Sequence, residues 1–168
     1  MRLMVFTDGS AHSKDRTGGW AFLVTDASTT KWFRLEFAPD TDTTNNRMEL
    51  LSVIRGITHA LTVDEVSEII VNTDSQYVKQ VYDFKGLLDT WEMCGWITST
   101  GTQVKNRDLW EQLKTILKSS RVPIRFKKIK AHSGHDENEY VDRAASIARK
   151  NQKRGYAQIH VYEKRVDY

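Results

Sequence analysis

Short apolar runs and alternating apolar positions predict four strands in the first half of the chain. Residues 3–6 and 69–71 are continuous apolar runs, as expected of strands buried on both faces, and the second run lies in a strand predicted over 66–73. Apolar residues alternate with other residues over 20–24 and 32–37, which predicts two more strands, the latter half-buried. Because short polar turns join the first three strands, we expect an antiparallel meander.

Apolar residues at helical spacing predict the helices that follow. These helices are expected over residues 45–61, 75–83, 86–91, 108–117 and 140–150. A fifth strand is predicted over 124–129, and its charged residues Arg125, Lys127 and Lys128 suggest an edge position. The order predicts an α/β fold with a five-stranded mixed sheet, an antiparallel meander plus parallel strands, and helices on both faces.

The chain length of 168 residues predicts one domain, which the elements place over residues 1–150. The remaining segment, 151–168, mixes Ile159, Val161 and Val166 with many charges. A short extra strand and a frayed tail are equally favoured for it.

Composition narrows the possible functions. No run of about 18 apolar residues occurs, so no membrane span is expected. The first predicted strand begins at the start of the chain, which leaves no room for a signal peptide. The single cysteine, Cys94, excludes an internal disulfide and suits a reducing cytoplasm. The formal net charge of +3 is compatible with a polyanionic partner but is weak evidence for one.

Two aspartates stand at the ends of predicted strands. Asp8 follows the strand over 3–6, and Asp74 follows the strand over 66–73, directly before Ser75, a good helix N-cap. If the two strands are parallel neighbours, both carboxylates reach one edge of the sheet, where open α/β sheets usually bind ligands. Converging carboxylates repel each other unless a cation lies between them. A single aspartate after a strand is more often a turn residue or a cap.

Two further acids lie near predicted helix starts. Glu49 is on the first predicted helix and Asp142 is on the last. An acid in a first turn usually does no more than balance the helix dipole. Four acids together, however, suit two Mg²⁺ ions about 4 Å apart, which clamp the attacking and leaving oxygens of a displacement at phosphorus.

The four acids occur in motifs that resemble those of the type 1 ribonuclease H family. The matching segments are Thr7-Asp8-Gly9-Ser10, Asn45-Asn46-Arg47-Met48-Glu49-Leu50, Thr73-Asp74-Ser75-Gln76-Tyr77-Val78, Val104-Lys105-Asn106-Arg107-Asp108-Leu109-Trp110, and Lys130-Ala131-His132-Ser133-Gly134-His135 followed by Asn138-Glu139 and Asp142. The resemblance runs from about residue 3 to residue 150 and implies a ribonuclease H-like fold, which agrees with the independent reading of the elements.

The resemblance implies an endoribonuclease that hydrolyses the RNA strand of RNA–DNA hybrids and leaves 5′-phosphate products. Asp8, Glu49 and Asp74 would hold the Mg²⁺ that activates water, and Asp8 would bridge to a second ion held with Asp142; Mn²⁺ is an alternative ion. We expect a cytoplasmic monomer. His132, on a predicted glycine-containing loop near Asp142, would assist proton transfer or product release near neutral pH, whereas a surface-loop histidine is the simpler interpretation.

Further residues are predicted to contact the hybrid. Asn45, Asn46 and Gln76 carry amides suited to minor-groove base edges and 2′-hydroxyls, and Thr44 and Arg47 are candidates for backbone phosphate. The segment from Trp91 to Trp96 resembles the family's substrate-binding handle, so both tryptophans are candidate substrate residues. It reads Glu92-Met93-Cys94-Gly95, however, without the usual Lys/Arg cluster, and Glu92 is expected to repel the substrate.

Two other functions are weighed against this one. A catalytically silent hybrid-binding module would be favoured by the loss of any of the four acids, and all four are present. A different nuclease on a related fold, such as a proofreading exonuclease, would need an Asp-x-Glu in the first strand, whereas Asp8 is followed by Gly9-Ser10. The loop after Ser10 also lacks the Asn-Pro-Gly type of segment found in bacterial members, which leaves substrate contacts there open.

Overall fold

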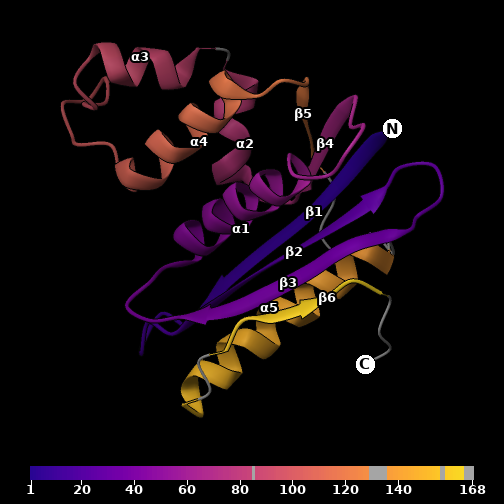
Figure 1. Ribbon diagram of the computed structural model, residues 1–168. Helices are drawn as coiled ribbons and strands as arrows, with labels where there is room; N and C mark the ends of the chain where they lie inside the picture. The colour runs from indigo at the N-terminus through magenta and orange to yellow at the C-terminus, as the bar shows by residue number, and fades with distance from the viewer. Residues whose placement is uncertain (85, 129–135, 156–157, 165–168) are drawn as a thin grey trace.

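The structure is a computed structural model that describes residues 1–164 except 85, 129–135 and 156–157. It contains a six-stranded sheet in the order β5-β4-β1-β2-β3-β6 (Figure 1). The strands are β1 (Arg2–Ala11), β2 (Gly18–Asp26), β3 (Trp32–Asp40), β4 (Glu68–Thr73), β5 (Ile124–Lys128) and β6 (His160–Tyr162). The helices are α1 (Asn45–Ala60), α2 (Gln76–Asp83), α3 (Leu87–Met93), α4 (Arg107–Ser119) and α5 (Asp136–Lys153).

The strand pairing confirms the predicted mixture of an antiparallel meander with parallel strands. Strands β1, β2 and β3 pair antiparallel in sequence, while β4 runs parallel to β1 and β5 runs parallel to β4. The predicted edge position of β5 is also confirmed. The sheet has six strands rather than the predicted five, because β6 adds antiparallel to β3 at the opposite edge, where the rings of His160 and Phe37 stack.

A bulge in β3 corrects the predicted alternation of that strand. Val24 pairs with Arg34, but Thr25 pairs with Trp32, so Phe33 is an extra residue in the ladder. The bulge turns the Trp32 ring to the same side as Leu35, where it is buried against α5. The strict alternation predicted over 32–37 would put Trp32 on the face opposite Leu35. The inserted residue reverses the alternation, so the two side chains share one face.

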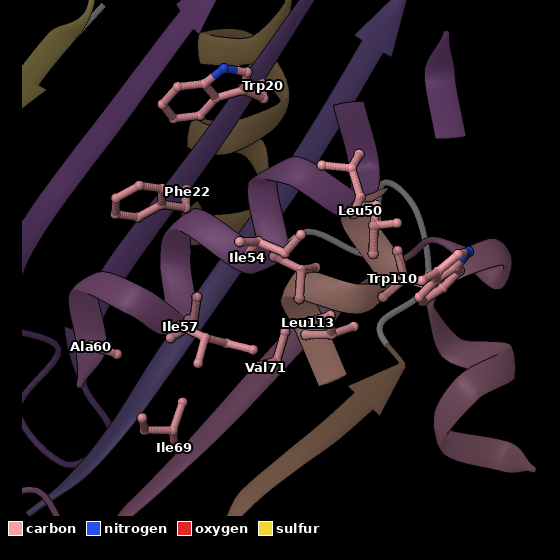
Figure 2. Packing of buried hydrophobic residues seen from close by; sticks show 14 of the residues in the cluster. Trp20, Phe22, Leu50, Ile54, Ile57, Ala60, Ile69, Val71, Trp110 and Leu113 are labelled. Carbon is pink, nitrogen blue, oxygen red and sulfur yellow. The ribbon is translucent and has the colours of Figure 1, made fainter. Parts of the chain in front are cut away.

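Helices cover both faces of the sheet, as predicted. On one face, α1, α2 and α4 bury a large cluster that includes Phe22, Ile57, Val71 and Trp110 (Figure 2). On the other face, α5 packs its alanine-rich side against β1, β2 and β3. Close approach there depends on Gly19, since a methyl group at this position would overlap the backbone of α5 at Ala145 and Arg149. Within the described residues, no helix is long and apolar enough to cross a membrane.

Candidate metal and catalytic site

The parallel pair β1 and β4 positions two of the four predicted acids. Strand β4 ends at Thr73, so Asp74 lies directly beyond its carboxyl end, and Ser75 caps α2 by accepting a hydrogen bond from the Val78 N–H at 3.2 Å. Strand β1 is longer than predicted, because its ladder with β2 continues to Ala11. Asp8 therefore lies within β1 but past the point where β4 stops, which leaves its carboxylate at the edge next to Asp74.

Helix α1 brings Glu49 to the same edge by an unusually close contact with β1. A methyl group on Gly9 would overlap backbone atoms of Met48 and Glu49, so only glycine allows α1 to lie this near the strand. The first turn of α1 contains no acidic residue, and Glu49 is in the second turn. A helix-dipole role therefore does not explain Glu49, whereas its position beside Asp8 does.

Asp142 reaches the site from α5. The helix begins at Asp136, four residues earlier than predicted, so Asp142 is in its second turn rather than its first. Buried Val141 and Ala145 fix this stretch of α5 against the sheet, and Asp142 is left partly exposed between them. The acid lines one pocket of about 130 Å³ together with Asp8, Gly9, Ser10, Asp74, Asn138, Glu139 and Ser146.

The carboxylates are close enough to share a cation. Asp8, Glu49 and Asp74 each offer an oxygen, and these oxygens all lie within 4.8 Å of one another. Burial raises the pKa of Asp8, and the neighbouring carboxylates of Asp74 and Asp142 raise it further. Burial likewise raises the pKa of Glu49, with Asp8 and then Asp74 adding to the shift. Both shifts show that the fold brings several carboxylates together in a partly buried place without enough positive charge to neutralise them.

An unsatisfied oxygen supports a metal at this place. Glu49 Oε2 is buried and has no hydrogen-bond partner among the described residues, which is costly for a carboxylate unless a ligand completes its contacts. Asp8 Oδ1, by contrast, accepts the Gly9 N–H at 2.9 Å. Oxygen donors of this kind, clustered and anionic, are the ligands that hard divalent cations take. The buried acidic group therefore fits a divalent metal site.

The predicted amide residues lie beside this site. Thr44 caps α1 by accepting the Arg47 N–H at 3.3 Å. Asn45 Oδ1 accepts the Ala11 N–H at 2.5 Å, which ties the start of α1 to the end of β1. Asn46 and Gln76 are exposed. These exposed amides lie at the N-terminal ends of α1 and α2, three residues before Glu49 and two residues after Asp74.

Arg47 has a different environment from the one expected of a phosphate ligand. Its guanidinium donates to both Asp108 oxygens, at 2.9 and 2.8 Å, and to Asn106 Oδ1 at 3.2 Å. This pairing holds the pKa of Asp108 below its usual range. A bidentate pair of this geometry binds α1 to α4. Arg47 thus already has a partner, which a phosphate would have to displace.

Sequence reasoning missed the role of Tyr77 as a hydrogen-bonding centre. Its Oη accepts from Asn106 Nδ2 at 2.9 Å and from Trp110 Nε1 at 3.1 Å, and donates to the Lys105 carbonyl at 3.3 Å. Asn106 adopts a left-handed backbone conformation with φ of 60°. The tyrosine therefore ties α2, which begins just after Asp74, to the start of α4. The helical spacing of apolar residues gives no signal for this role, because the hydrogen-bond partners of Tyr77 lie about 30 residues further along the chain.

The handle is an aromatic scaffold. The Trp91 ring lies 6.3 Å from the Trp96 ring and 5.6 Å from the Trp110 ring. Trp96 is only 4% exposed, so the structure places it in packing rather than on a substrate-facing surface, while Trp91 is half-buried. Glu92 does not stand alone as a repulsive charge, because the buried Lys114 donates to it at 2.6 Å. The expected repulsion from Glu92 is corrected accordingly.

His132, the predicted assisting histidine, lies outside the described residues, as does the rest of the segment 129–135.

Comparisons with known proteins agree with this geometry. The family model for RNase H matches residues 1–150. A ribonuclease H from Oleidesulfovibrio alaskensis is 40% identical over 151 residues, which cover 90% of this chain and 90% of the relative. A ribonuclease H from Thermus thermophilus is 42% identical over 144 residues, covering 86% of this chain and 81% of the relative.

Solved structures show the same fold. LC9-RNase H1, described as a type 1 RNase H with the type 2 active-site motif, superposes with a TM-score of 0.71 at 23% identity, over 99% of this chain and 77% of that one. The N-terminal RNase H domain of a Mycobacterium tuberculosis protein gives a TM-score of 0.69 at 20% identity, over 93% and 99% of the two chains. At these identities the likeness concerns the fold, and it extends over nearly the whole chain.

Proposed function

The chain belongs to the RNase H family, and we infer that it is a nuclease that hydrolyses the RNA strand of RNA–DNA hybrids. The observation that carries this function is the convergence of Asp8, Glu49 and Asp74, from three separate elements, with oxygens within 4.8 Å of one another. Asp142 lies in the same pocket as Asp8 and Asp74. Such a group has no structural benefit, since the carboxylates raise one another's pKa.

We propose that two Mg²⁺ ions occupy this site, with Mn²⁺ as a substitute. Asp8, Glu49 and Asp74 would hold one ion, and Asp8 with Asp142 would hold the other. When bound, a pair of such ions activates the attacking water and stabilises the leaving oxygen of an in-line displacement at phosphorus. Mg²⁺ commonly uses one or two carboxylates together with waters and substrate phosphate, so four acids suffice for two ions.

The chain's own residues would place the scissile phosphate against the carboxylates. The site lies at the open carboxyl edge of β1 and β4, and the pocket beside it is bounded by Asn138 and Glu139 of α5. The bond that breaks joins phosphorus to the RNA 3′-oxygen, and the bond that forms joins phosphorus to water oxygen. The products are therefore a 3′-hydroxyl and a 5′-phosphate.

The amides at the helix ends would read the hybrid's minor groove. Asn45 Oδ1 accepts a hydrogen bond from the Ala11 N–H, so the amide Nδ2 of Asn45 is the atom that would donate to the substrate. A free amide N–H suits the acceptors that the minor groove offers, and 2′-hydroxyls distinguish RNA from DNA. Asn46 and Gln76 are exposed beside it, and Thr44 stands at the same helix end. We propose Asn45, Asn46 and Gln76 as minor-groove contacts and Thr44 as a contact to backbone phosphate. Trp91 is proposed as a partly exposed contact of the handle.

His132 is proposed to assist proton transfer or product release. The proposal rests on the family motif His132-Ser133-Gly134-His135, ahead of Asp142 in the sequence. A histidine titrates near neutral pH, which suits this role. Residues 1–150 are proposed as the catalytic domain, with 151–168 as an accessory segment, and the protein is proposed to act as a cytoplasmic monomer.

A single assay separates this function from its alternatives. A hybrid labelled on the RNA strand is incubated with the protein and Mg²⁺, beside the same reaction with chelator and beside duplex DNA of the same sequence. We expect RNA fragments with 5′-phosphate ends that appear only with the metal ion, and intact duplex DNA. Binding without cleavage would indicate a silent hybrid-binding module, and cleavage of duplex DNA would indicate another class of nuclease.

A further inference from the structure

We propose that the carboxyl end of β5 is a phosphate-binding subsite, in which Lys127 and Lys128 hold backbone phosphates of the hybrid next to the scissile one. The proposal rests on the function inferred above, and it concerns a part of the chain that the catalytic site does not use. Basic residues of the handle and its supporting helices are mostly in ion pairs, whereas the lysines at the end of β5 are not paired with any described residue.

The handle and its supporting helices keep almost all of their positive charge in internal ion pairs. Lys114 binds Asp89 at 3.2 Å and Glu92 at 2.6 Å, and Lys118 binds Asp89 at 2.8 Å. Lys79 pairs with Asp83 and Arg107 pairs with Glu111. Among the described residues from 76 to 119, only Lys105 is a basic residue without an ion pair. The handle therefore offers little charge to a polyanion.

Strand β5 shows the opposite arrangement. Lys127 and Lys128 are exposed, and neither has an ion-pair partner among the described residues. Arg125, two positions before Lys127, is instead bound to Glu68 at 2.6 Å. The free charge on β5 is thus confined to the end of the strand that lies nearest to the carboxylates.

The sheet register places these lysines close to the metal site. Lys128 pairs with Thr73, the residue before Asp74, and Lys127 pairs with Asn72. Neighbouring strands lie about 4.8 Å apart, so β5 is about 10 Å from β1 and Asp8 across the intervening β4. One strand of a duplex carries a charge every 3.4 Å or so of helix axis, so phosphates that flank the scissile one lie within that range.

Phosphate is the ligand that this arrangement fits best. Two unpaired ammonium groups on neighbouring residues can neutralise successive phosphates, and such contacts supply most of the sequence-independent affinity for a duplex. Successive side chains of a strand point to opposite faces of the sheet, so Lys127 and Lys128 project from different faces of β5. Their ammonium groups can therefore reach the carboxyl end of the strand from both faces. Exposed lysines also protect an edge strand from pairing with another chain, and this simpler role predicts no effect on the hybrid.

The test measures hybrid affinity across a salt series. Asp74→Asn protein, which should bind without cutting, serves as the background for Lys127→Gln, Lys128→Gln and the double variant. Lys150→Gln is the matched control, because Lys150 is an exposed lysine at the far end of α5 with no ion pair among the described residues. Fluorescence anisotropy with a labelled hybrid gives Kd at each salt concentration, and thermal unfolding checks that every variant is folded.

We expect each β5 variant to weaken binding and to reduce the slope of log affinity against log salt by about one unit, with about two for the double variant. The control should keep the parent slope. An unchanged slope in the double variant would overturn the proposal, and if that variant also self-associates, the lysines serve edge protection. An equal change in the control would overturn it as well, because charge anywhere on the chain would then suffice. Hydrolysis by the parent protein is measured separately, so failure of the inferred activity is recognised independently.

Discussion

Charged side chains are arranged in opposite ways at the catalytic edge, which is the carboxyl end of β1 and β4, and in the handle. At the edge, Asp8 and Glu49 are partly buried beside other acids, and neither forms an ion pair with a described residue. In the handle, Lys114 is buried but meets two carboxylates of α3. The first arrangement costs stability and requires a cation, whereas the second joins two helices. The comparison shows that the reactive part of this fold differs from its scaffold in whether the charged side chains are paired, rather than in how many there are.

Removing charge from the edge should have the largest effect on activity. In Asp8→Asn the amide keeps the shape but loses a ligand charge, so we expect hydrolysis to fall by about three orders of magnitude, as loss of several kcal/mol of metal-assisted stabilisation implies. The same variant should unfold at a higher temperature than the wild type without metal, because carboxylate repulsion is relieved. Single-turnover cleavage and calorimetry measure both effects. Near wild-type turnover would refute the role of Asp8.

A smaller loss of activity is expected for the assisting histidine. His132→Ala should slow turnover by about tenfold to a hundredfold, in the lower range of general acid–base effects, with little change in substrate affinity. His135→Ala is the matched control from the same segment and should have a much weaker effect. The kcat of each variant at saturating hybrid decides this prediction. Equal rates for His132→Ala and wild type would make His132 a loop residue without a catalytic part.

Removing a charge from the handle should lower stability and leave turnover unchanged, whereas removing one from the edge should raise stability and lower turnover. In Lys114→Met the apolar stem stays buried but both ion pairs are lost, so we expect a modest fall in the unfolding temperature, because Asp89 and Glu92 are largely exposed and solvent screens the pairs. Turnover at saturating substrate should stay close to wild type. Thermal denaturation and steady-state kinetics measure the two quantities. A large fall in kcat with unchanged stability would show that the handle takes part in catalysis.

Adding charge to the handle should have the smallest effect. Met93 is 88% exposed, so Met93→Lys adds a cation without breaking an ion pair, unlike a change at Glu92. We expect tighter hybrid binding and a salt slope that steepens by up to about one unit, with kcat unchanged. Met93→Gln is the neutral control for side-chain length and polarity. If the lysine leaves the slope as it was, this segment does not touch the hybrid.

Local pattern predicted most of the elements and the convergence of Asp8 and Asp74, because apolar periodicity and strand ends can be recognised from neighbouring residues. Glu49 and Asp142 were linked to the same site only through the family resemblance. It did not predict the partner of Arg47, since Asp108 is 61 residues away and the pairing depends on how α1 meets α4. The same limit explains the pairing of Glu92 with Lys114. The orientation of Trp32 depends on one bulged residue, which the alternation of apolar residues does not reveal.

Gly9 illustrates a further limit of sequence reasoning. Its place after Asp8 suggested only a motif, whereas the structure shows that it permits the contact between β1 and α1 that delivers Glu49. A small residue is informative only once its neighbours in space are known. The predicted convergence of Asp8 and Asp74 needed no such knowledge, because parallel neighbouring strands bring their carboxyl ends to one edge.

The central claim is that the edge carboxylates are held together for a divalent cation. Their pKa values are raised in the folded chain, so the folded state keeps protons that the unfolded state loses at its ordinary carboxyl pKa. Without metal, stability should therefore fall as pH rises above that ordinary value and through the neutral range. A cation binds the deprotonated carboxylates, so the stabilisation that it gives should increase over the same range.

The most direct test is the unfolding temperature of the full chain between about pH 5.5 and about pH 8.5, measured with chelator and with excess Mg²⁺. We predict that the unfolding temperature with chelator falls by at least about 5 °C across the range. Each proton that the folded chain retains costs about 1.4 kcal/mol per pH unit, and each kcal/mol lowers the unfolding temperature by about 2–4 °C for a domain of this size. Mg²⁺ should reverse most of that fall. Asp8→Asn should reduce both effects, because one titrating carboxylate and one metal ligand are lost while burial still raises the pKa of Glu49. A wild-type curve that ignores both pH and Mg²⁺ would contradict the account.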